Sequence, residues 1–391
     1  MNRVYLDNNA TSPLAPEVFE AMRPYLLEDF GNASSIHWYG QRAKAAVEKA
    51  REQVARLLNA RASEIVFTSG GTESDNAAIL GIVEAARGEH KHVVTTAIEH
   101  PAVLSTAKAL AKRGVGVTYV HVGPGGVVDP GDVAAALRPE TMLISVMHAN
   151  NELGSLQPLE EIGRIARERD IYFHTDAVQS VGKIPVDVNN LGVDLLALSA
   201  HKLYGPKGVG ALYVRRGTIL RPILHGGHHE RDRRPGTENV AGAVGLGAAA
   251  ECACLHITEE YSRVAALRDR LEAGILASVP GVAVNGDRAC RVPNTTNLTF
   301  DFIDGEGFVI ATDLRGIACS TGSACSSGSL EPSHVLSAIG LKPERARASI
   351  RFSLGRFNTD ADVEDTLRIL PAVVEQLRAV SPRYSKAVVS G

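Results

Sequence analysis

Apolar and polar residues alternate regularly between about residues 64 and 215. Short runs rich in Val, Ile, Leu and Phe are separated by stretches with helical spacing of their apolar residues, such as residues 159–170. This alternation predicts an α/β fold with a mostly parallel sheet that is covered by helices on both faces. The seven predicted strands cover residues 64–69, 92–98, 116–122, 142–148, 171–177, 194–200 and 209–214.

The pattern changes after a long helical stretch near residues 257–279. Strand-like runs follow at residues 282–286, 294–302 and 348–354. The chain then carries an amphipathic helix whose apolar stripe is Val363, Leu367, Leu370, Val374 and Leu377, preceded by the capping sequence "NTDAD". Because proline lacks an N–H and clashes with the preceding turn, Pro371 is expected to kink or split this helix.

These changes of pattern predict three parts of the chain. Residues 1–14 form an N-terminal segment that packs with the C-terminal domain. Residues 15–258 form a large domain, and residues 259–391 form a smaller α/β domain. A chain of 391 residues is long enough for two such domains, each with its own core.

Composition and charge exclude several classes of protein. A net charge of −3 gives no sign of a nucleic-acid or membrane surface. No apolar run approaches the ~20 residues of a membrane helix, and the first residues do not resemble a secretory signal. We therefore expect a cytoplasmic protein.

The number and spacing of the cysteines also favour a cytoplasmic protein. Five cysteines, in this spacing, suit neither a disulfide framework nor a four-cysteine zinc site. Cys252 and Cys254 lie in an Ala-rich helical stretch, which favours ordinary packing over metal ligation. No metal site is expected.

Polar residues gather where the predicted strands end, which is the edge where parallel sheets bind ligands. The sequence "SGGTESDN" after the first strand offers Gly70, Gly71 and Thr72 at a helix start. Free N–H groups, a positive helix end and a hydroxyl form a cradle for an anion. The stretch lacks the P-loop lysine and the dinucleotide-binding glycine spacing, so a nucleotide is not expected.

The other strands end in a set of polar residues that together suggest one cofactor. This set comprises His100, Asn150, Asn151, Asp176, Gln179, Ser199, His201 and Lys202. Asp176 and Lys202 are separated by about one strand–helix–strand unit, so both face the same crevice. A phosphate cradle, a lysine for a Schiff base, a carboxylate for a pyridine nitrogen and an imidazole to stack on a ring are what pyridoxal 5′-phosphate requires.

Two further cysteines lie in the flexible stretch "IACSTGSACSSGSLEP" of residues 317–332. Cys319 and Cys325 are surrounded by Ser, Thr, Gly and Ala, whereas a structural cysteine normally has apolar neighbours. For Cys319 we favour a buried position at the end of a strand. Cys325 lies in a flexible polar loop, which would allow its thiol to move.

The ordered motifs along the chain resemble those of the cysteine desulfurases, which are dimeric, fold-type-I pyridoxal-phosphate enzymes. The resemblance rests on "YLDNNAT", "FTSGGTESDN", "EHPAVL", "NNELG", "DAVQS", "SAHKLYGPKG", "RRPGTEN", "SACSSGSLEPSHVL" and "SIRFSLGRF". It covers nearly the whole chain. The residues around "GTEN" and "SGSLEPSHV" are more similar to those of the nitrogen-fixation branch (NifS-like) than to those of the housekeeping branch (IscS-like).

The resemblance implies a role for each cofactor contact. Lys202 carries the Schiff base and moves protons, Asp176 pairs with the pyridine nitrogen, and Gln179 bonds the ring oxygen. His100 stacks on the ring and serves as an acid–base group. The phosphate contacts are Gly71, Thr72, Ser199 and His201, with Thr237 supplied by the partner subunit.

It also implies how substrate and sulfur are handled. Asn151, also a cofactor contact, and Arg351 bind the substrate carboxylate, and Cys325 is the nucleophile. L-Cysteine becomes L-alanine, and its sulfur becomes a persulfide on Cys325. If the loop shuttles sulfur, residues 321–329 should be more mobile than their flanks. Without substrate, Cys325 should then lie beyond the ~4 Å contact range of Lys202 and the cofactor.

The implied partners are a second copy of the chain and an iron–sulfur scaffold or sulfur-acceptor protein, with nitrogenase as the expected destination. Cys325 could then contact an iron–sulfur cluster bound to the acceptor. Alternatives remain a housekeeping desulfurase, a selenocysteine lyase, a pyridoxal-phosphate aminotransferase, and a sulfur carrier without enzymatic activity. The carrier would have no use for Lys202 and Asp176.

Overall fold

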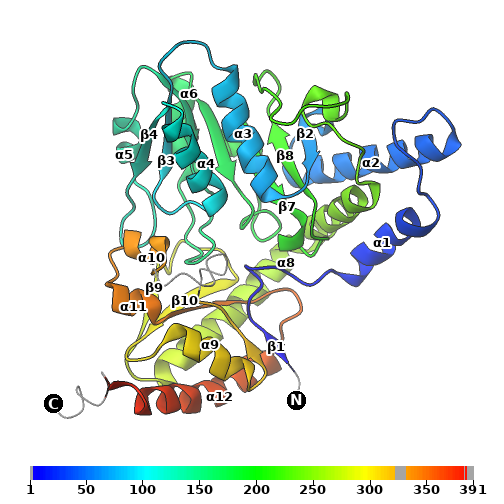
Figure 1. The fold of residues 1–391 in the computed structure, drawn as a ribbon. Helices are drawn as coiled ribbons and strands as arrows, with labels where there is room; N and C mark the ends of the chain where they lie inside the picture. The colour runs from blue at the N-terminus through cyan, green and yellow to red at the C-terminus, as the bar shows by residue number, and fades with distance from the viewer. Residues whose placement is uncertain (1–2, 322–331, 383, 385–391) are drawn as a thin grey trace.

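The computed structural model describes residues 3–321, 332–382 and 384 (Figure 1). Its largest element is a seven-stranded sheet in the order β2-β8-β7-β6-β5-β3-β4. The strands are β2 (Ile65–Thr68), β3 (His92–Thr96), β4 (Gly116–Val120), β5 (Thr141–Ser145), β6 (Tyr172–Asp176), β7 (Leu195–Ser199) and β8 (Gly210–Val214). β8 runs antiparallel to both of its neighbours, β2 and β7, and the other neighbouring pairs are parallel. The predicted α/β fold with a mostly parallel seven-stranded sheet is confirmed.

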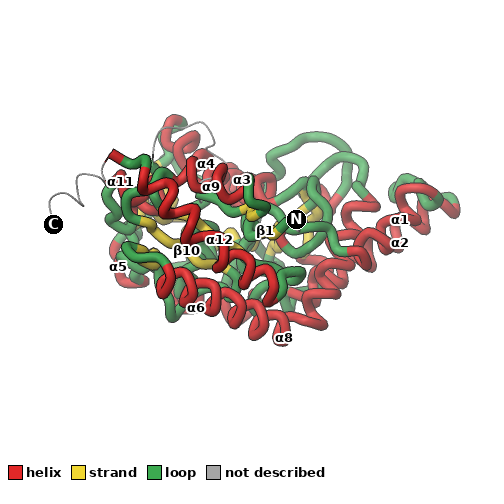
Figure 2. The backbone as a smooth tube through the Cα atoms, turned by 90° about the horizontal axis from the view of Figure 1, so that it is seen from below, coloured by secondary structure: helices red, strands yellow, loops and turns green. Residues whose placement is uncertain are grey.

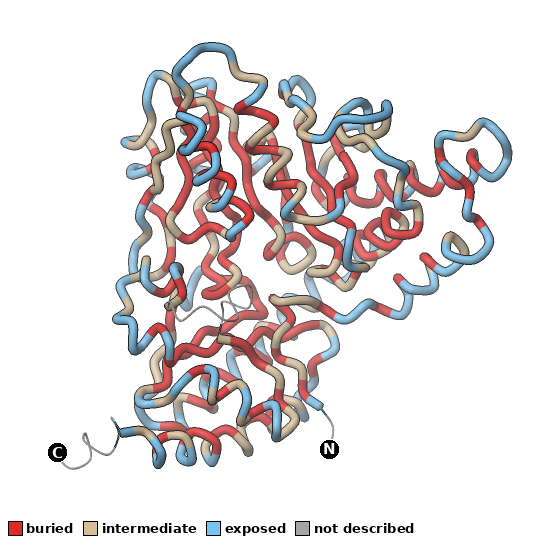
Figure 3. Tube along the Cα trace, viewed as in Figure 1, coloured by how far each residue is buried: buried red, intermediate tan, exposed pale blue. Residues whose placement is uncertain are grey.

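Helices cover both faces of this sheet, because both faces of its strands are apolar. On one face, Val66, Val93 and Leu143 form a core with residues of α3 (Gly71–Ala85) and α4 (Pro101–Lys112). The opposite face packs against α2 (Trp38–Leu57), α6 (Leu159–Glu168) and the first half of α8 (Val240–Ser278). Shorter helices, α5 (Pro130–Ala135) and α7 (Val188–Leu191), lie in the connections. The buried residues run along the strands in Figure 3.

The C-terminal part contains an antiparallel sheet in the order β12-β10-β9. Its strands are β9 (Val282–Asn285), β10 (Thr295–Phe300) and β12 (Ser349–Ser353), and its helices are α9 (Gly305–Asp313), α10 (His334–Ala338), α11 (Pro343–Arg347) and α12 (Asp360–Ala379). Near the N-terminus, β1 (Val4–Tyr5) pairs in parallel with β11 (Ile317–Ala318). The N-terminal segment, which the sequence predicted to pack with the C-terminal domain, thus joins it by strand pairing.

A single helix connects the two parts. Ala243 and Leu246 in the first half of α8 pack into the core of the large sheet, whereas Leu267 and Ile275 in the second half pack into the C-terminal core. The domain boundary predicted at residue 258 falls inside this unbroken helix. Its second half lies beside α12 on the underside of the molecule (Figure 2).

By length and composition alone, α8 could cross a membrane. This differs from the sequence expectation, because the many Ala and Gly residues of its first half are apolar without forming a run of large side chains. Ala243, Leu246, Ala249 and Ala250 are buried against the rest of the protein. The same composition is typical of a core helix.

The last helix follows its predicted pattern but not the predicted interruption. Thr359 and Asp362 form a reciprocal capping box at the start of α12. The helix continues through Pro371 to Ala379 without splitting. Val363, before the proline, and Val374, after it, pack into the same core, so packing maintains the helix across the proline.

A buried ion pair connects α2 to the segment that carries Thr237. The guanidinium of Arg51 donates to both carboxylate oxygens of Glu230, at 2.6 and 2.9 Å. The N–H of Phe67 also donates to Glu230, at 2.9 Å, and both charged side chains are about 5% exposed or less. Removing Glu230 would leave the buried guanidinium of Arg51 with the half-exposed carboxylate of Glu48, 3.2 Å away, as its charged partner.

We therefore expect Glu230→Gln to lower the free energy of unfolding by about 3 kcal/mol, as is typical of a broken buried pair. Urea unfolding at fixed protein concentration measures this change. Glu20→Gln, which breaks the exposed pair between Arg23 and Glu20, is the matched control and should leave stability nearly unchanged. Equal effects of the two variants would contradict the role given to the buried pair.

Candidate functional site

A cavity of about 410 Å³ opens at the carboxyl ends of the parallel strands. Ten residues singled out from the sequence line it: Gly71, Thr72, His100, Asn151, Asp176, Gln179, Ser199, His201, Lys202 and Arg351. The volume is in the usual range for a site that encloses a small cofactor. The structure therefore brings together residues that are far apart in the sequence.

Four residues singled out from the sequence are not part of the described lining: Gly70, Asn150, Thr237 and Cys325. Asn150 is buried and donates its amide to the carbonyl of Ile98 at 3.0 Å. Thr237 is exposed and lies outside the residues that form the cavity wall. Cys325 lies outside the described residues. The expectations about the mobility of residues 321–329 and about the distance of Cys325 from Lys202 fall on that same segment.

The start of α3 supplies the anion cradle. Gly70 precedes the helix with φ 153° and ψ −177°, a conformation that is essentially restricted to glycine. A Cβ atom at Gly71 would lie 2.7 Å from Cγ2 of Val178, so this position is also closed to side chains. The first backbone N–H groups of a 15-residue helix thus remain accessible beside the Thr72 hydroxyl, which suits a phosphate.

Lys202 follows β7 in a short 3-10 turn (η2, Ala200–Lys202). Its Nζ donates to the backbone carbonyl oxygens of Asn9 and Ala10, the latter at 2.7 Å. These carbonyls belong to the segment that follows β1. The amine is therefore held at the cavity by neutral oxygen acceptors.

Asp176, at the end of β6, and His100, before α4, both line the cavity. Burial raises the pKa of Asp176, although the neighbouring His100, a 2.9 Å hydrogen bond from the Val178 N–H and the charge of Lys202 oppose this. Burial lowers the pKa of His100. Its Nδ1 accepts from the Ala102 N–H at 3.1 Å, so the ring proton of the neutral form belongs on Nε2.

A second buried carboxyl, Asp75, adjoins Asp176. It is 1% exposed, and burial followed by the charge of Asp176 raises its pKa well above the ordinary value. Its Oδ1 lies 3.5 Å from Nε2 of His174. Ligand-type atoms of Asp75, His100 and Asp176 all lie within 4.8 Å of one another. Two buried carboxyls this close to each other favour a cationic or proton-donating partner, such as a protonated ring nitrogen.

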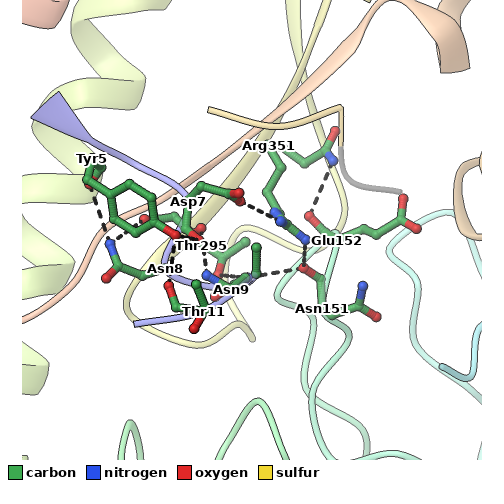
Figure 4. A network of polar contacts seen from close by, with 12 residues as sticks. Tyr5, Asp7, Asn8, Asn9, Thr11, Asn151, Glu152, Thr295 and Arg351 are labelled. Carbon is green, nitrogen blue, oxygen red and sulfur yellow. Dashed lines mark hydrogen bonds and ion pairs between the residues drawn. The ribbon is translucent and has the colours of Figure 1, made fainter. Parts of the chain in front are cut away.

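Arg351, on β12, reaches the cavity from the C-terminal part (Figure 4). Its Nη2 pairs with Oδ1 of Asp7 at 2.7 Å, and its Nη1 donates to the carbonyl of Asn151 at 2.9 Å. The amide of Asn9 donates to that same carbonyl at 3.1 Å and to the Thr295 hydroxyl at 2.8 Å. These contacts hold a guanidinium that is only 2% exposed in one orientation.

Cys319 is buried, as predicted, at the end of β11. Its Sγ lies 3.5 Å from the Thr312 hydroxyl, and it packs in the C-terminal core. Burial raises the pKa of this thiol to about 12. Because only the thiolate is a good nucleophile, Cys319 is chemically inert at neutral pH.

The cavity fits pyridoxal phosphate on the chemistry of its donors. The start of α3 offers N–H groups to a phosphate, Lys202 offers an amine to an aldehyde, and Asp176 offers a buried carboxylate to a ring nitrogen. The glycine-only position at Gly70 keeps the phosphate region free of side chains. These three features are arranged around one cavity.

Sequence reasoning missed eight lining residues: Asn9, Ala10, Asp75, Pro101, Met147, Glu152, Val178 and His334. Asp75 could have been predicted to line the cavity, because it follows Thr72 by three residues on a helix and so lies on the same helix face. No sequence pattern could have predicted Asn9 and Ala10. They reach the cavity through backbone carbonyls, which any residue possesses.

Comparison with known proteins agrees with this geometry. Residues 4–366 match the aminotransferase class-V family. The chain is 52% identical to a cysteine desulfurase IscS of Dictyoglomus turgidum, over 97% of this chain and 96% of that protein. It is also 52% identical to a cysteine desulfurase of Trichormus azollae, over 98% of this chain and 95% of that one.

Solved structures show the same relationship. A NifS-like protein superposes with a TM-score of 0.90 at 38% identity, covering 97% of this chain and all of that one. SspA in complex with cysteine superposes with a TM-score of 0.82 at 40% identity, covering 91% of this chain and all of that one. On this evidence, the chain belongs to the class-V aminotransferase family and, within it, to the pyridoxal-phosphate-dependent cysteine desulfurases.

Proposed function

We propose that this enzyme removes sulfur from L-cysteine, releases L-alanine, and carries the sulfur on Cys325 as a persulfide for an acceptor in iron–sulfur cluster assembly. The observation that carries the proposal is the cavity itself. It places the amine of Lys202, the carboxyl of Asp176 and the guanidinium of Arg351 around one space with an anion cradle.

Pyridoxal phosphate, when bound, supplies an aldehyde for amines and a ring that accepts electrons from the substrate. The start of α3 with Thr72, Ser199 and His201 would hold its phosphate. Asp176 would keep its ring nitrogen protonated. The neutral imidazole of His100 would lie against its ring, with the proton on Nε2 available for transfer.

Lys202 is the residue that moves protons at the substrate carbon. Its amine is held by the carbonyls of Asn9 and Ala10, so it stays at the cavity when it is not covalently engaged. There Nζ can take the proton from Cα of the substrate and return one later. Both acceptors are neutral, so releasing the amine breaks no ion pair with them.

Arg351 orients the substrate through its α-carboxylate. Asp7 and the Asn151 carbonyl fix the plane of the guanidinium, and burial keeps water away from it. A guanidinium with a fixed plane binds a carboxylate with less loss of conformational freedom than a mobile one. The side chain of Asn151 lines the same region of the cavity.

The sulfur step requires a thiolate. Cys325 attacks the sulfur of the substrate, a sulfur–sulfur bond forms, and the bond between that sulfur and Cβ breaks. The electron pair of the broken bond stays with the carbon fragment, which takes up a proton and leaves as L-alanine. Cys319 cannot replace Cys325, because its thiol is buried and its pKa is about 12.

For the acceptor we propose an iron–sulfur scaffold protein, with Cys325 approaching the cluster that it carries. The sequence motifs favoured nitrogenase clusters as the destination. Relatives from Dictyoglomus and Methanosarcina instead bear the name IscS, that of the housekeeping branch. A general supply of sulfur is therefore better supported than a supply dedicated to nitrogenase.

We also propose a cytoplasmic homodimer with two composite sites. Exposed Phe30, Ile36 and Trp38 lie at the projecting arm formed by the end of α1 (Pro16–Leu27) and the start of α2, and they offer an apolar contact surface. Thr237 is exposed on its own chain, which suits a contact to the partner's phosphate. Cys252, Cys254, Cys290 and Cys319 are free thiols, which supports a reducing compartment.

Lys202→Ala should abolish covalent attachment of the cofactor, because Lys202 is the one lysine in the described lining of the cavity. We expect the visible absorbance of the purified protein to be lost on dialysis, and turnover to fall by about three orders of magnitude or more. Absorbance spectra and alanine release measure the two effects. Lys91→Met, distant from the cavity, should retain both.

Cys325→Ala should bind the cofactor normally and release neither sulfide nor alanine, because no thiolate accepts the sulfur. Cys319→Ala should keep most of the activity, and native Cys319 should resist alkylation at pH 8, since its pKa of about 12 leaves almost no thiolate. Mass spectrometry after alkylation identifies the reactive cysteine. A reversal of the two phenotypes would overturn the assignment.

Mixed dimers test whether Thr237 acts across the interface. A Lys202→Ala chain paired with a Thr237→Ala chain has one site with both Lys202 and the partner's Thr237, so about half of the native activity is expected. A chain carrying both substitutions, paired with a native chain, has no such site and should be markedly slower. Equal activity of the two mixed dimers, or a fully active monomer in sedimentation, would contradict the composite site.

A further inference from the structure

Lys183 is a lysine beside the cavity that the reaction described above does not use. It lies in the loop after β6, four residues beyond Gln179. Its Nζ donates to Oε1 of Gln179 at 2.7 Å and to Oδ1 of Asn9 at 3.0 Å. Within the described part of the chain, no carboxylate forms a salt bridge with this amine. A partly buried lysine bound only to amide oxygens requires an explanation.

The contact with Gln179 has a direct geometric consequence. A lysine amine that donates to Oε1 selects one of the two ways in which the Gln179 amide can lie. Nε2 then occupies the other side, where it donates one N–H to the backbone carbonyl of Asn9 at 3.0 Å. Because Gln179 is 5% exposed and lines the cavity, its amide has few other partners available.

Asn9 is held in the same network. Its Oδ1 accepts from Lys183 and, at 2.9 Å, from the Asn294 amide. Its backbone carbonyl accepts from both Gln179 and Lys202. Lys183 therefore holds Oε1 of Gln179 in place. It also holds Asn9, whose backbone carbonyl accepts an N–H from Gln179.

We propose that Lys183 is a positioning residue that fixes the amide of Gln179 so that an N–H, rather than the carbonyl, faces the cofactor's ring oxygen. The inference rests on the proposed contact between Gln179 and that oxygen. A ring oxygen with negative charge needs a donor. A flipped amide would present a second oxygen to it and repel it.

The environment explains why a lysine can perform this task. Burial lowers the pKa of Lys183 well below its usual value, and the positive charges of Lys202 and Arg351 lower it further. Two N–H donors of the amine match the two amide oxygens that it contacts.

The test is the pH dependence of the bound cofactor's visible absorbance. Lys183→Met keeps the length of the side chain and removes its donors. The pH midpoint of the visible band should rise by about half to one pH unit, because the ring oxygen loses one hydrogen bond and the neighbouring proton is held more tightly. Gln179→Ala should raise the midpoint by a similar amount.

The double variant Lys183→Met with Gln179→Ala separates positioning from a simple charge effect. If Lys183 acts through Gln179, the double variant should shift no further than Gln179→Ala alone. Additive shifts would mean that Lys183 acts independently, which would overturn the proposal. Lys91→Met is the matched control, because the Lys91 amine donates to the Val83 carbonyl at 2.6 Å, away from the cavity. It should leave the midpoint unchanged.

The outcomes also separate this inference from the proposed role of Gln179. An unchanged midpoint in Lys183→Met, together with a shift in Gln179→Ala, overturns the role of Lys183 alone. An unchanged midpoint in Gln179→Ala overturns the contact with the ring oxygen itself. Lys183→Arg, which keeps N–H donors, should restore the native midpoint. If the methionine variant does not fold, Lys183→Leu removes the same donors and provides the same test.

Discussion

The ion pair between Asp7 and Arg351 is the contact on which the geometry of the site depends. Arg351 belongs to the C-terminal sheet and must reach into a cavity that is built mainly by the large sheet. Its charge is almost fully buried, so it needs a partner with matching charge and geometry. Asp7 is that partner, and it is supplied by the N-terminal segment beside β1.

That same segment holds Lys202 at the cavity. Two residues after Asp7, the carbonyl of Asn9 accepts from Lys202, and the carbonyl of Ala10 accepts as well. Because β1 pairs with β11, the segment is anchored in the C-terminal part while its carbonyls lie in the cavity. Displacement of a few residues near the N-terminus would therefore disturb the contacts of both Arg351 and Lys202.

The charges of the cavity are balanced with few ion pairs. Lys202 and Lys183 contact neutral oxygens, and burial lowers the pKa of His100, which favours its neutral form. Asp176 and Asp75 are buried together, and burial raises the pKa of each. A bound ring nitrogen would complete this set by placing a positive charge next to the carboxyls. The buried carboxyls thus favour a ligand that brings a positive charge to this side of the cavity.

Most of the fold could be predicted from the sequence, because the spacing of apolar residues marks each strand and most helices. The seven runs that became β2 to β8 are apolar enough to be buried on both faces, and that property alone predicts a parallel sheet between helices. One exception is informative. Pro371 did not split α12, because packing on both sides of the proline maintained the helix.

The sequence by itself determined which chemistry the site can perform, since Lys202, Asp176 and the glycine-rich start of α3 are side-chain and backbone types that few other reactions combine. Only the tertiary structure decided how these groups are held. Lys202 donates to a backbone carbonyl of the N-terminal segment, and Lys183 donates to the amide oxygen of Gln179. Backbone carbonyls are the same in every residue, and amide orientation depends on neighbours that are distant in sequence, so neither leaves a pattern in the order of amino acids.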